Sequence, residues 1–253
     1  MNETLTTERT LFNPISNNVR SHSAAPRRCG HRQLRHPGYG GTMGESSKRS
    51  IYGDAEARRR RTLDAAAALL DEGGYAALTI RSVAKRSGTS VGLIYQYFTD
   101  KQDIFTSLLN ESQIESRSFV ATIPRDRGVA ALLAAVLPES TRQWGRVGRF
   151  TATWRDIEGD NRAERESVRE VRRTAREYNT ELHAALTEAA EAEGRVLRDD
   201  PSMLPFVLSA LQGVADTIVH NWAADLDHTE LTRFAAESLT RAITVDDRSR
   251  TQT

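Results

Sequence analysis

The chain has 253 residues, of which 27% are charged and 38% hydrophobic, and its 35 Lys and Arg nearly balance its 34 Asp and Glu. This length suffices for one large or two modest domains, and the longest apolar run, residues 129–137, falls far short of the roughly 20 residues that span a bilayer. The single cysteine, Cys29, excludes an intramolecular disulfide and a multi-thiolate zinc site. We therefore expect a protein of the reducing cytoplasm, with no membrane segment, metal site or cofactor.

Residues 1–50 show no sustained apolar period and are rich in Ser, Asn, Gly, Pro and Arg, which predicts a disordered N-terminal extension. Five Arg and no acidic residue lie between Arg20 and Pro37. One interpretation is a flexible basic arm that contacts a nucleic acid. The other is that translation begins at Met43, close to where the regular pattern starts.

A first helix is predicted from Leu63, Ala67 and Leu70, whose spacing gives one apolar face, and Gly73-Gly74 marks its end. Four arginines, residues 58–61, precede it. Such a run is either a solvated face or a clamp on a phosphate, and the sequence leaves both open.

Residues 79–101 predict two short helices joined by a tight turn. Thr79 and Ser90 are placed to cap the two helix N-termini, and Gly88 between them suits the left-handed conformation in which helices commonly end. Apolar residues recur at i, i+3 and i+4 from Ile80, which gives the first helix a buried face. This spacing fits a helix-turn-helix.

The second of these helices has two distinct faces. Ile94 and Phe98 fall on the inward side at about 100° per residue, and four residues lie on the outward arc: Gly92, Leu93, Tyr95 and Gln96. Gly92 costs about 1 kcal/mol relative to Ala in a helix, so we expect it to permit close approach of another molecule. An outward arc of this kind suits DNA.

The polar residues of this segment match the chemistry of a duplex. Gln96 offers a paired donor and acceptor to adenine in the major groove. Tyr95 and Tyr97 suit phosphate oxygens, and Lys101 adds a cation at the start of the next helix.

At these positions the chain resembles the TetR/AcrR family of transcriptional regulators, from about Glu56 to Glu115. The residues that carry the resemblance are Leu63, Ala67, Leu70, Gly73, Gly74, Tyr75, Thr79, Ile80, Arg81, Val83, Ala84, Gly88, Ser90, Gly92, Ile94, Tyr95, Tyr97, Phe98 and Lys101. The chain departs from the family at Tyr97, where His is frequent. Gln96 occupies a position that varies between members, so it does not reveal the operator sequence.

The resemblance implies an all-α fold, with a three-helix DNA-binding domain followed by a helical bundle that binds a small molecule and dimerises. It implies a homodimeric repressor that a small molecule releases from a palindromic double-stranded DNA operator. The DNA contacts that it implies are Thr79, Arg81, Ser90, Val91, Gly92, Leu93, Tyr95, Gln96, Tyr97 and Lys101. The corresponding domains are 1–50 (extension), 51–116 (DNA-binding), 117–245 (effector-binding and dimerisation) and 246–253 (flexible tail).

Helical patterns continue to the end of the chain. One helix should run on from Asp103 until Pro124 interrupts, and an apolar helix over residues 129–137 should end at Pro138. Residues 144–156 are less regular. An amphipathic helix is predicted over residues 162–193, ending at Gly194.

The last two predicted helices carry the dimerisation hypothesis. Residues 203–222 have apolar residues on two sides, and residues 231–243 supply a partner stripe. Two such helices meeting their copies would form a four-helix interface. An ordinary intrachain core is the alternative.

Large apolar residues also suggest an effector pocket between helices. The candidate lining residues are Trp144, Phe150, Trp154, Tyr178 and Phe206, with Arg155, Asp156 or His183 orienting the ligand. No nucleophile with a base, metal-ligand spacing or Gly-rich phosphate loop is evident, so we do not expect an enzyme. An effector-independent architectural protein of the nucleoid is the second alternative to a repressor.

Overall fold

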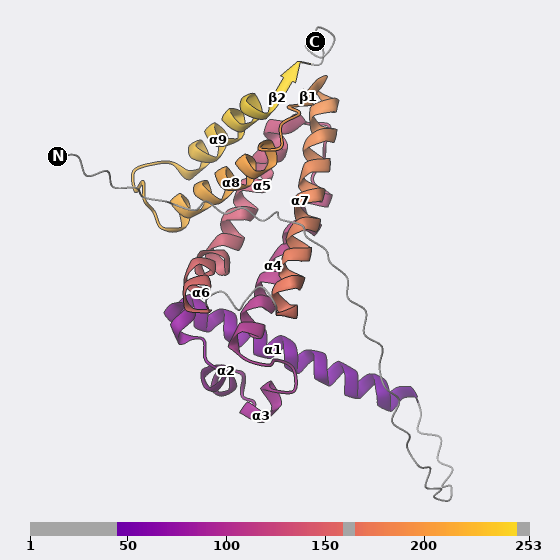
Figure 1. Ribbon diagram of the computed structural model, residues 1–253, viewed down its shortest axis with the longest axis vertical. Helices are drawn as coiled ribbons and strands as arrows, with labels where there is room; N and C mark the ends of the chain where they lie inside the picture. The colour runs from indigo at the N-terminus through magenta and orange to yellow at the C-terminus, as the bar shows by residue number, and fades with distance from the viewer. Residues whose placement is uncertain (1–44, 159–164, 247–253) are drawn as a thin grey trace, which may run out of the picture. The chain divides into compact units, whose positions relative to one another are not determined.

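A computed structural model describes residues 45–158 and 165–246. Within these ranges the chain forms nine α-helices, one 3-10 turn and two short antiparallel strands (Figure 1). The all-α prediction is therefore confirmed, apart from a small ribbon that the sequence did not indicate. The predictions of a basic arm or a start at Met43, and of a flexible tail after residue 246, lie outside the described residues.

Four helices form the N-terminal part: α1 (Glu45–Ala77), α2 (Ile80–Ser87), α3 (Val91–Ile94) and α4 (Lys101–Thr122). α1 begins at Glu45, so the prediction that irregular chain extends to residue 50 is wrong for its last residues. Gly74 interrupts the helical conformation of α1 with φ 66°. This break is the one predicted from Gly73-Gly74, because only glycine adopts a positive φ at little cost.

The core of the N-terminal helices also includes residues from much later in the chain. Its buried members are Leu63, Ala65, Ala66, Leu70, Tyr75, Leu78, Val83, Ala84, Ile94, Phe98, Ile104, Phe105, Leu108, Leu109, Val147, Trp154 and Val168. The last three follow the predicted domain boundary at 116/117. The DNA-binding domain of the prediction therefore shares its core with the segment that leads into the bundle.

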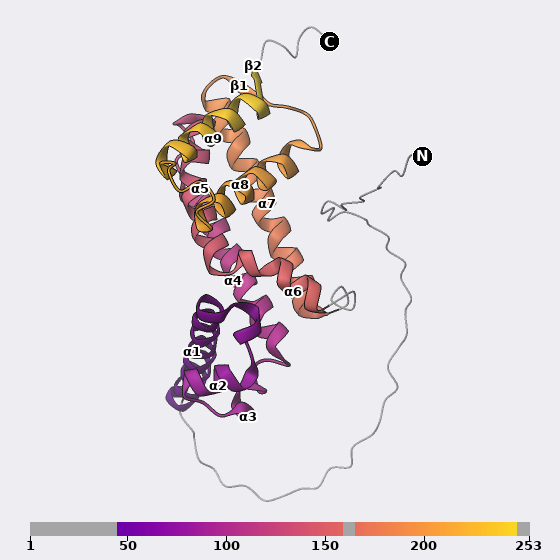
Figure 2. The same ribbon diagram turned by 90° about the vertical axis from the view of Figure 1, so that its left-hand side faces the viewer.

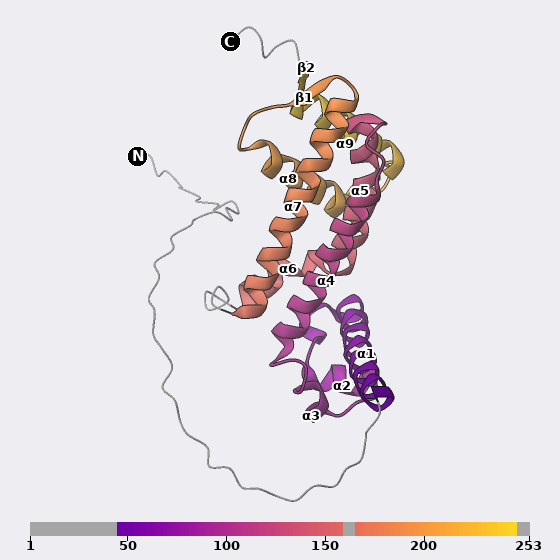
Figure 3. The same cartoon turned by 90° about the vertical axis from the view of Figure 1, so that its right-hand side faces the viewer.

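The remaining elements are α5 (Gly128–Arg146), a 3-10 turn (Gly148–Phe150), α6 (Thr151–Glu158), α7 (Glu166–Ala192), β1 (Arg195–Leu197), α8 (Met203–Val219), α9 (His228–Ile243) and β2 (Thr244–Asp246). α8 and α9 lie side by side and pack on α5 (Figure 2). α4 and α7 run alongside each other (Figure 3). A second core of Leu, Val and Ala side chains fills this bundle, around Leu132, Leu133, Leu182, Leu186 and Leu211.

The end of α5 differs from the prediction. The helix continues through Pro138 to Arg146, so the expectation that it ends at Pro138 is wrong. Proline removes one backbone hydrogen bond and crowds the preceding turn, but Pro138 lies on the exposed side of α5, where water can replace that bond. The less regular segment predicted after it contains the 3-10 turn and α6.

The two strands pair with each other: β1 directly follows α7 and β2 directly follows α9. Val196 pairs with Val245, and Leu197 pairs with Thr244. Gly194, with φ 69°, ends α7 as predicted and turns the chain into β1. Strands of three residues carry no apolar alternation long enough to recognise in a sequence.

Candidate nucleic-acid interface

Local hydrogen bonds set the geometry of the helix-turn-helix. The hydroxyl of Thr79 accepts a hydrogen bond from the backbone N–H of Ser82 at 3.1 Å, and the hydroxyl of Ser90 accepts one from Leu93 at 3.1 Å. Gly88 between them has φ 66° and ψ 30°. Both predicted caps and the predicted left-handed glycine are confirmed, so the angle between α2 and α3 follows from residues within the motif.

We call residues 91–98 the recognition segment. α3 itself has four residues, but backbone hydrogen bonds continue the turn, including Tyr95 N–H to Val91 at 3.2 Å and Phe98 N–H to Ile94 at 3.0 Å. Ile94 is 0% exposed and Phe98 3% exposed. These two side chains anchor the segment in the core beneath it, as the apolar spacing predicted.

The opposite side of the recognition segment faces solvent. Tyr95 is 56% exposed and Val91 38% exposed, and Gln96 is exposed as well. A Cβ atom placed on Gly92 would meet no atom within 4 Å apart from its chain neighbours and the backbone of its own helix. The backbone at Gly92 is therefore open to approach from outside.

The ten residues predicted to contact DNA fall into two groups by exposure. Seven are exposed: Thr79, Arg81, Ser90, Val91, Gly92, Tyr95 and Gln96. Leu93, Tyr97 and Lys101 are half-buried. They all belong to the short stretch from the start of α2 to the start of α4, and their role as DNA contacts stays a prediction.

Lys101 has a structural contact that the sequence did not reveal. Its ammonium nitrogen lies 4.4 Å from the centroid of the Tyr75 ring, a cation–π geometry. Tyr75 packs edge-on against Phe105 at 5.1 Å between ring centroids, and Phe105 lies 5.5 Å from Trp154. The cation at the start of α4 is thus held near the end of α1.

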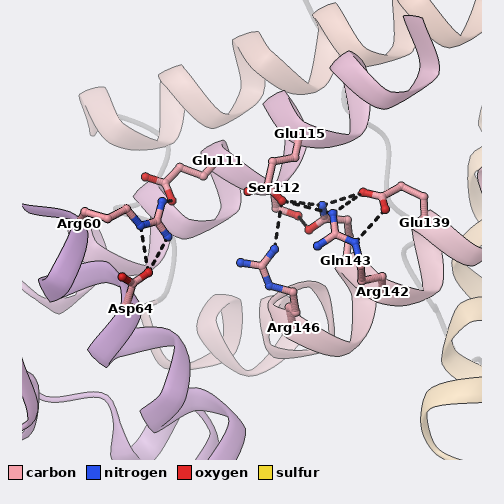
Figure 4. A network of polar contacts seen from close by, with 9 residues as sticks. All are labelled: Arg60, Asp64, Glu111, Ser112, Glu115, Glu139, Arg142, Gln143 and Arg146. Carbon is pink, nitrogen blue, oxygen red and sulfur yellow. Dashed lines mark hydrogen bonds and ion pairs between the residues drawn. The ribbon is translucent and has the colours of Figure 1, made fainter. Parts of the chain in front are cut away.

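The arginine run separates into residues with different partners. Arg60 donates to Glu111 of α4 at 2.9 Å and to Asp64 at 2.9 Å (Figure 4), and Arg59 donates to Glu111 at 3.4 Å. Arg61 is exposed and makes no ion pair with any residue that the structure describes. Two of the four arginines therefore tie α1 to α4, and Arg61 lies exposed on α1.

A second carboxylate of α4, one turn further on, faces α5. Glu115 accepts hydrogen bonds from Gln143 at 3.1 Å and from Arg146 at 3.0 Å (Figure 4). Partial burial works to raise the pKa of Glu115, but the hydrogen bond from Gln143 and the nearby cations Arg146 and Arg142 outweigh it, so the pKa is lowered. This network was not predicted from the sequence. The i, i+4 spacing of Glu111 and Glu115 was its only signal.

The five candidate effector residues do not surround one space in the described part of the chain. Phe150 and Trp154 pack in the core of the N-terminal helices, while Tyr178 packs against the core of the bundle. Trp144 donates from its indole nitrogen to Asp216 at 2.8 Å, and Phe206 is 51% exposed. The prediction of a common pocket is therefore not supported by their placement.

Two concave sites have other linings. One, of about 360 Å³, lies beside the recognition segment and includes Tyr97, Asp103 and Glu170. The other, of about 210 Å³, includes His183 and Arg198 next to β1. Neither contains any of the five candidates. Across residues 45–158 and 165–246, no group of three or more His, Cys, Asp or Glu is placed to hold a metal ion, and no helix has the length and apolarity to cross a bilayer.

Comparison with known proteins agrees with the helix-turn-helix geometry. The model of the family described as "Bacterial regulatory proteins, tetR family" matches residues 63–108. The HTH-type transcriptional repressor KstR of Rhodococcus jostii (strain RHA1) is 37% identical over 87 residues, which cover 34% of this chain and 40% of KstR. The regulator HbdR of Aromatoleum sp. (strain CIB) is 48% identical over 56 residues, or 22% of this chain and 24% of HbdR.

Solved structures extend the likeness in fold beyond this segment. FadR from Bacillus subtilis, in complex with stearoyl-CoA, has a TM-score of 0.54 at 20% identity and covers 72% of this chain and 97% of its own. A protein of unknown function from Rhodococcus sp. RHA1 has a TM-score of 0.58 at 17% identity, covering 74% and 95%. Identities this low show the fold alone.

The matches to KstR and HbdR span less than half the length of either relative. The family model, over residues 63–108, falls on the helices that carry the capped turn and the anchored recognition segment. Over residues 63–108, the chain is therefore similar to the TetR family of bacterial regulatory proteins.

Proposed function

We propose that this chain is a sequence-specific DNA-binding repressor that acts as a homodimer and is released from its operator by a small molecule. The observation that carries the DNA-binding role is the two-sided recognition segment. Ile94 and Phe98 are buried beneath it, while Gly92, Tyr95 and Gln96 are exposed on its other side. The outer residues of so short a segment contribute little to a core. The stability of the fold therefore does not explain why they are there.

Each exposed group has a role in a major-groove complex. Gln96 presents an amide to a base edge, where it can both donate and accept a hydrogen bond. Tyr95 presents a hydroxyl to the phosphate backbone, as do Thr79 and Ser90 beside their capping bonds. Gly92 lets the backbone approach the duplex closely.

Cations around the segment supply the sequence-independent part of binding. Arg81 is exposed on α2, and Arg61 is exposed on α1. Each phosphate that such a cation neutralises releases counterions, so the affinity should fall as the salt concentration rises. Lys101 contributes to this field while it packs over Tyr75.

Exposed apolar side chains on α8 and α9 support the homodimer. Val207, Leu211 and Ala215 of α8 are buried within the chain, but Phe206 is 51% exposed and Phe234 of α9 is 63% exposed. Large apolar residues exposed on neighbouring helices are typical of an interface between subunits. The same two helices were predicted to dimerise because α8 is apolar on two sides.

Selection of duplexes from a randomised library by the purified full-length chain tests the proposal. We expect a recurrent sequence with two related halves, bound more tightly than unrelated DNA. Tyr95→Ala should weaken binding to all duplexes, whereas Gln96→Ala should cost about 1–3 kcal/mol at one base pair in each half. Absence of any preferred duplex at low salt would refute sequence-specific binding, and a monomeric bound species would refute the homodimer.

A further inference from the structure

The residue that precedes α7 is bound to the residue that precedes α4. Arg165 donates from its two terminal nitrogens to the two carboxylate oxygens of Asp100, at 3.1 and 2.5 Å. Both side chains are 35% exposed. This is the paired geometry in which a guanidinium fixes the orientation of a carboxylate as well as its position.

Asp100 is also the residue that caps α4. Its carboxylate accepts a hydrogen bond from the backbone N–H of Asp103 at 3.1 Å, and Asp103 accepts one in return from the backbone N–H of Thr99 at 2.8 Å. These bonds cap the N-terminus of α4 in the manner of a capping box, except that the return bond reaches Thr99, one residue before the N-cap. Phe98, the buried anchor of the recognition segment, lies two residues before Asp100, so the position of Asp100 constrains the end of that segment.

The ionisation of Asp100 agrees with this arrangement. Partial burial acts to raise its pKa, but the hydrogen bonds from Arg165 and from backbone N–H groups of Asp103 and Gln102 outweigh that effect, and the pKa is lowered. The carboxylate is therefore charged at neutral pH, as the ion pair requires.

Apolar contacts bring the same part of the bundle against α4. Val168, in the first turn of α7, is 4% exposed and belongs to the core of the N-terminal helices. Trp154 of α6 packs on Phe105 of α4. By contrast, Arg173 on the same helix pairs with Glu170 and Glu177 of α7 itself. Arg165, at the start of α7, thus reaches across to Asp100, next to the recognition segment.

We propose that Arg165 is a positioning residue for DNA binding. By holding the capping carboxylate of α4, it fixes the orientation of the recognition segment relative to the bundle. The fixed orientation restricts the spacing between operator half-sites that the protein accepts. The proposal rests on the DNA-binding homodimer proposed above. In this proposal Arg165 makes the connection between the recognition segment and the bundle more rigid, and it does not itself touch the duplex.

The test uses the duplex that the wild-type chain selects, and versions of it with one base pair inserted or removed between the halves, a shift of about 3.4 Å. The variants are Arg165→Ala and Asp100→Asn, because asparagine caps helices as well as aspartate does while it carries no charge. Arg173→Ala is the matched control, since it removes an arginine whose partners lie within α7. Thermal unfolding of each variant is measured in parallel.

For the wild-type chain we expect a steep loss of affinity on either change of spacing. Arg165→Ala and Asp100→Asn should bind the selected duplex about three- to tenfold more weakly and lose less affinity on the altered spacings. The double variant should match the single ones, because both remove the same interaction. Arg173→Ala should keep the wild-type profile.

Two results would overturn the inference. One is a wild-type spacing profile in Arg165→Ala. The other is a uniform loss on all three duplexes accompanied by a lower melting temperature, which would mark a stabilising pair only. Failure of the wild-type chain to select any duplex would instead overturn the proposed function, and the inference with it.

Discussion

Gly92 offers a substitution whose effects on the free protein and on DNA binding should have opposite signs. Gly92 is exposed within α3, and it is not among the glycines with positive φ. A Cβ atom there meets nothing within 4 Å. Gly92→Ala should therefore fit without strain and stabilise the unbound chain by up to about 1 kcal/mol, since alanine loses less backbone entropy in a helix. For a chain of this size that is a rise of about 2–4 °C in melting temperature.

Binding should change in the other direction. If the backbone at Gly92 lies against the duplex, the added methyl group displaces the recognition segment and weakens the neighbouring contacts of Tyr95 and Gln96. The loss of one well-formed base contact is worth about 1–3 kcal/mol, or roughly a 5- to 150-fold weaker Kd.

The assay pairs thermal unfolding with fluorescence anisotropy on the selected duplex at one fixed salt concentration. Ser118→Ala, on the exposed side of α4, is the control, because it also raises helix propensity but lies outside the recognition segment. An affinity of Gly92→Ala equal to that of the wild-type chain would refute close approach at this glycine. A lowered melting temperature would show instead that the local backbone does not accept a side chain.

Two further substitutions test other parts of the structure. Phe234→Asp places a charge on the exposed apolar side of α9, and we expect a monomer with an intact fold, as judged by light scattering and circular dichroism; a dimer of unchanged stability would place the interface elsewhere. Burial, together with the nearby carboxylate of Glu139, raises the pKa of Tyr178 to about 12 even though Ser140 hydrogen-bonds to it. The stability it contributes is therefore present below the ordinary tyrosine pKa of 10.0 and is lost as the pH rises through about 12. In urea titrations, the unfolding free energy of Tyr178→Phe should therefore fall by about 2 kcal/mol less than that of the wild-type chain between about pH 9 and pH 11.5. An equal fall in both proteins would contradict this.

The helix-turn-helix could be predicted from the sequence because its determinants are local. Thr79, Gly88 and Ser90 act on backbone groups no more than four residues away. The two faces of the recognition segment follow from helical periodicity, which separates Ile94 from Tyr95 without knowledge of the rest of the fold.

Long-range partners could not be predicted in the same way. An apolar residue at helical spacing shows that a side chain will be buried, but not against which helix. Trp154 and Phe150 were therefore expected to line an effector pocket, whereas they complete the core of the N-terminal helices. The arginine run was ambiguous for the same reason, since Glu111, which binds Arg59 and Arg60, lies about fifty residues further on.

Pro138 illustrates a different limit. A proline within an apolar run usually ends a helix, and this rule predicted the end of α5. Contact between α5 and α8 continues past this residue, since Trp144 of α5 donates to Asp216 of α8, and Pro138 itself is exposed. The free energy gained by burying the rest of the helix therefore outweighs one missing hydrogen bond, which a local pattern cannot show.

α4 is held by charged groups on three sides, and their exposure limits what they contribute. Asp100 binds α7 through Arg165, Glu111 binds α1 through Arg59 and Arg60, and Glu115 binds α5. These pairs are partly exposed, so each adds at most about 1 kcal/mol to stability. Their directional hydrogen bonds nevertheless fix rotation and sliding of α4, which apolar packing resists less specifically. The recognition segment ends just before α4 begins. A small change in these pairs should therefore alter the orientation of the recognition segment, with little loss of the apolar packing in the core of the N-terminal helices or of the bundle.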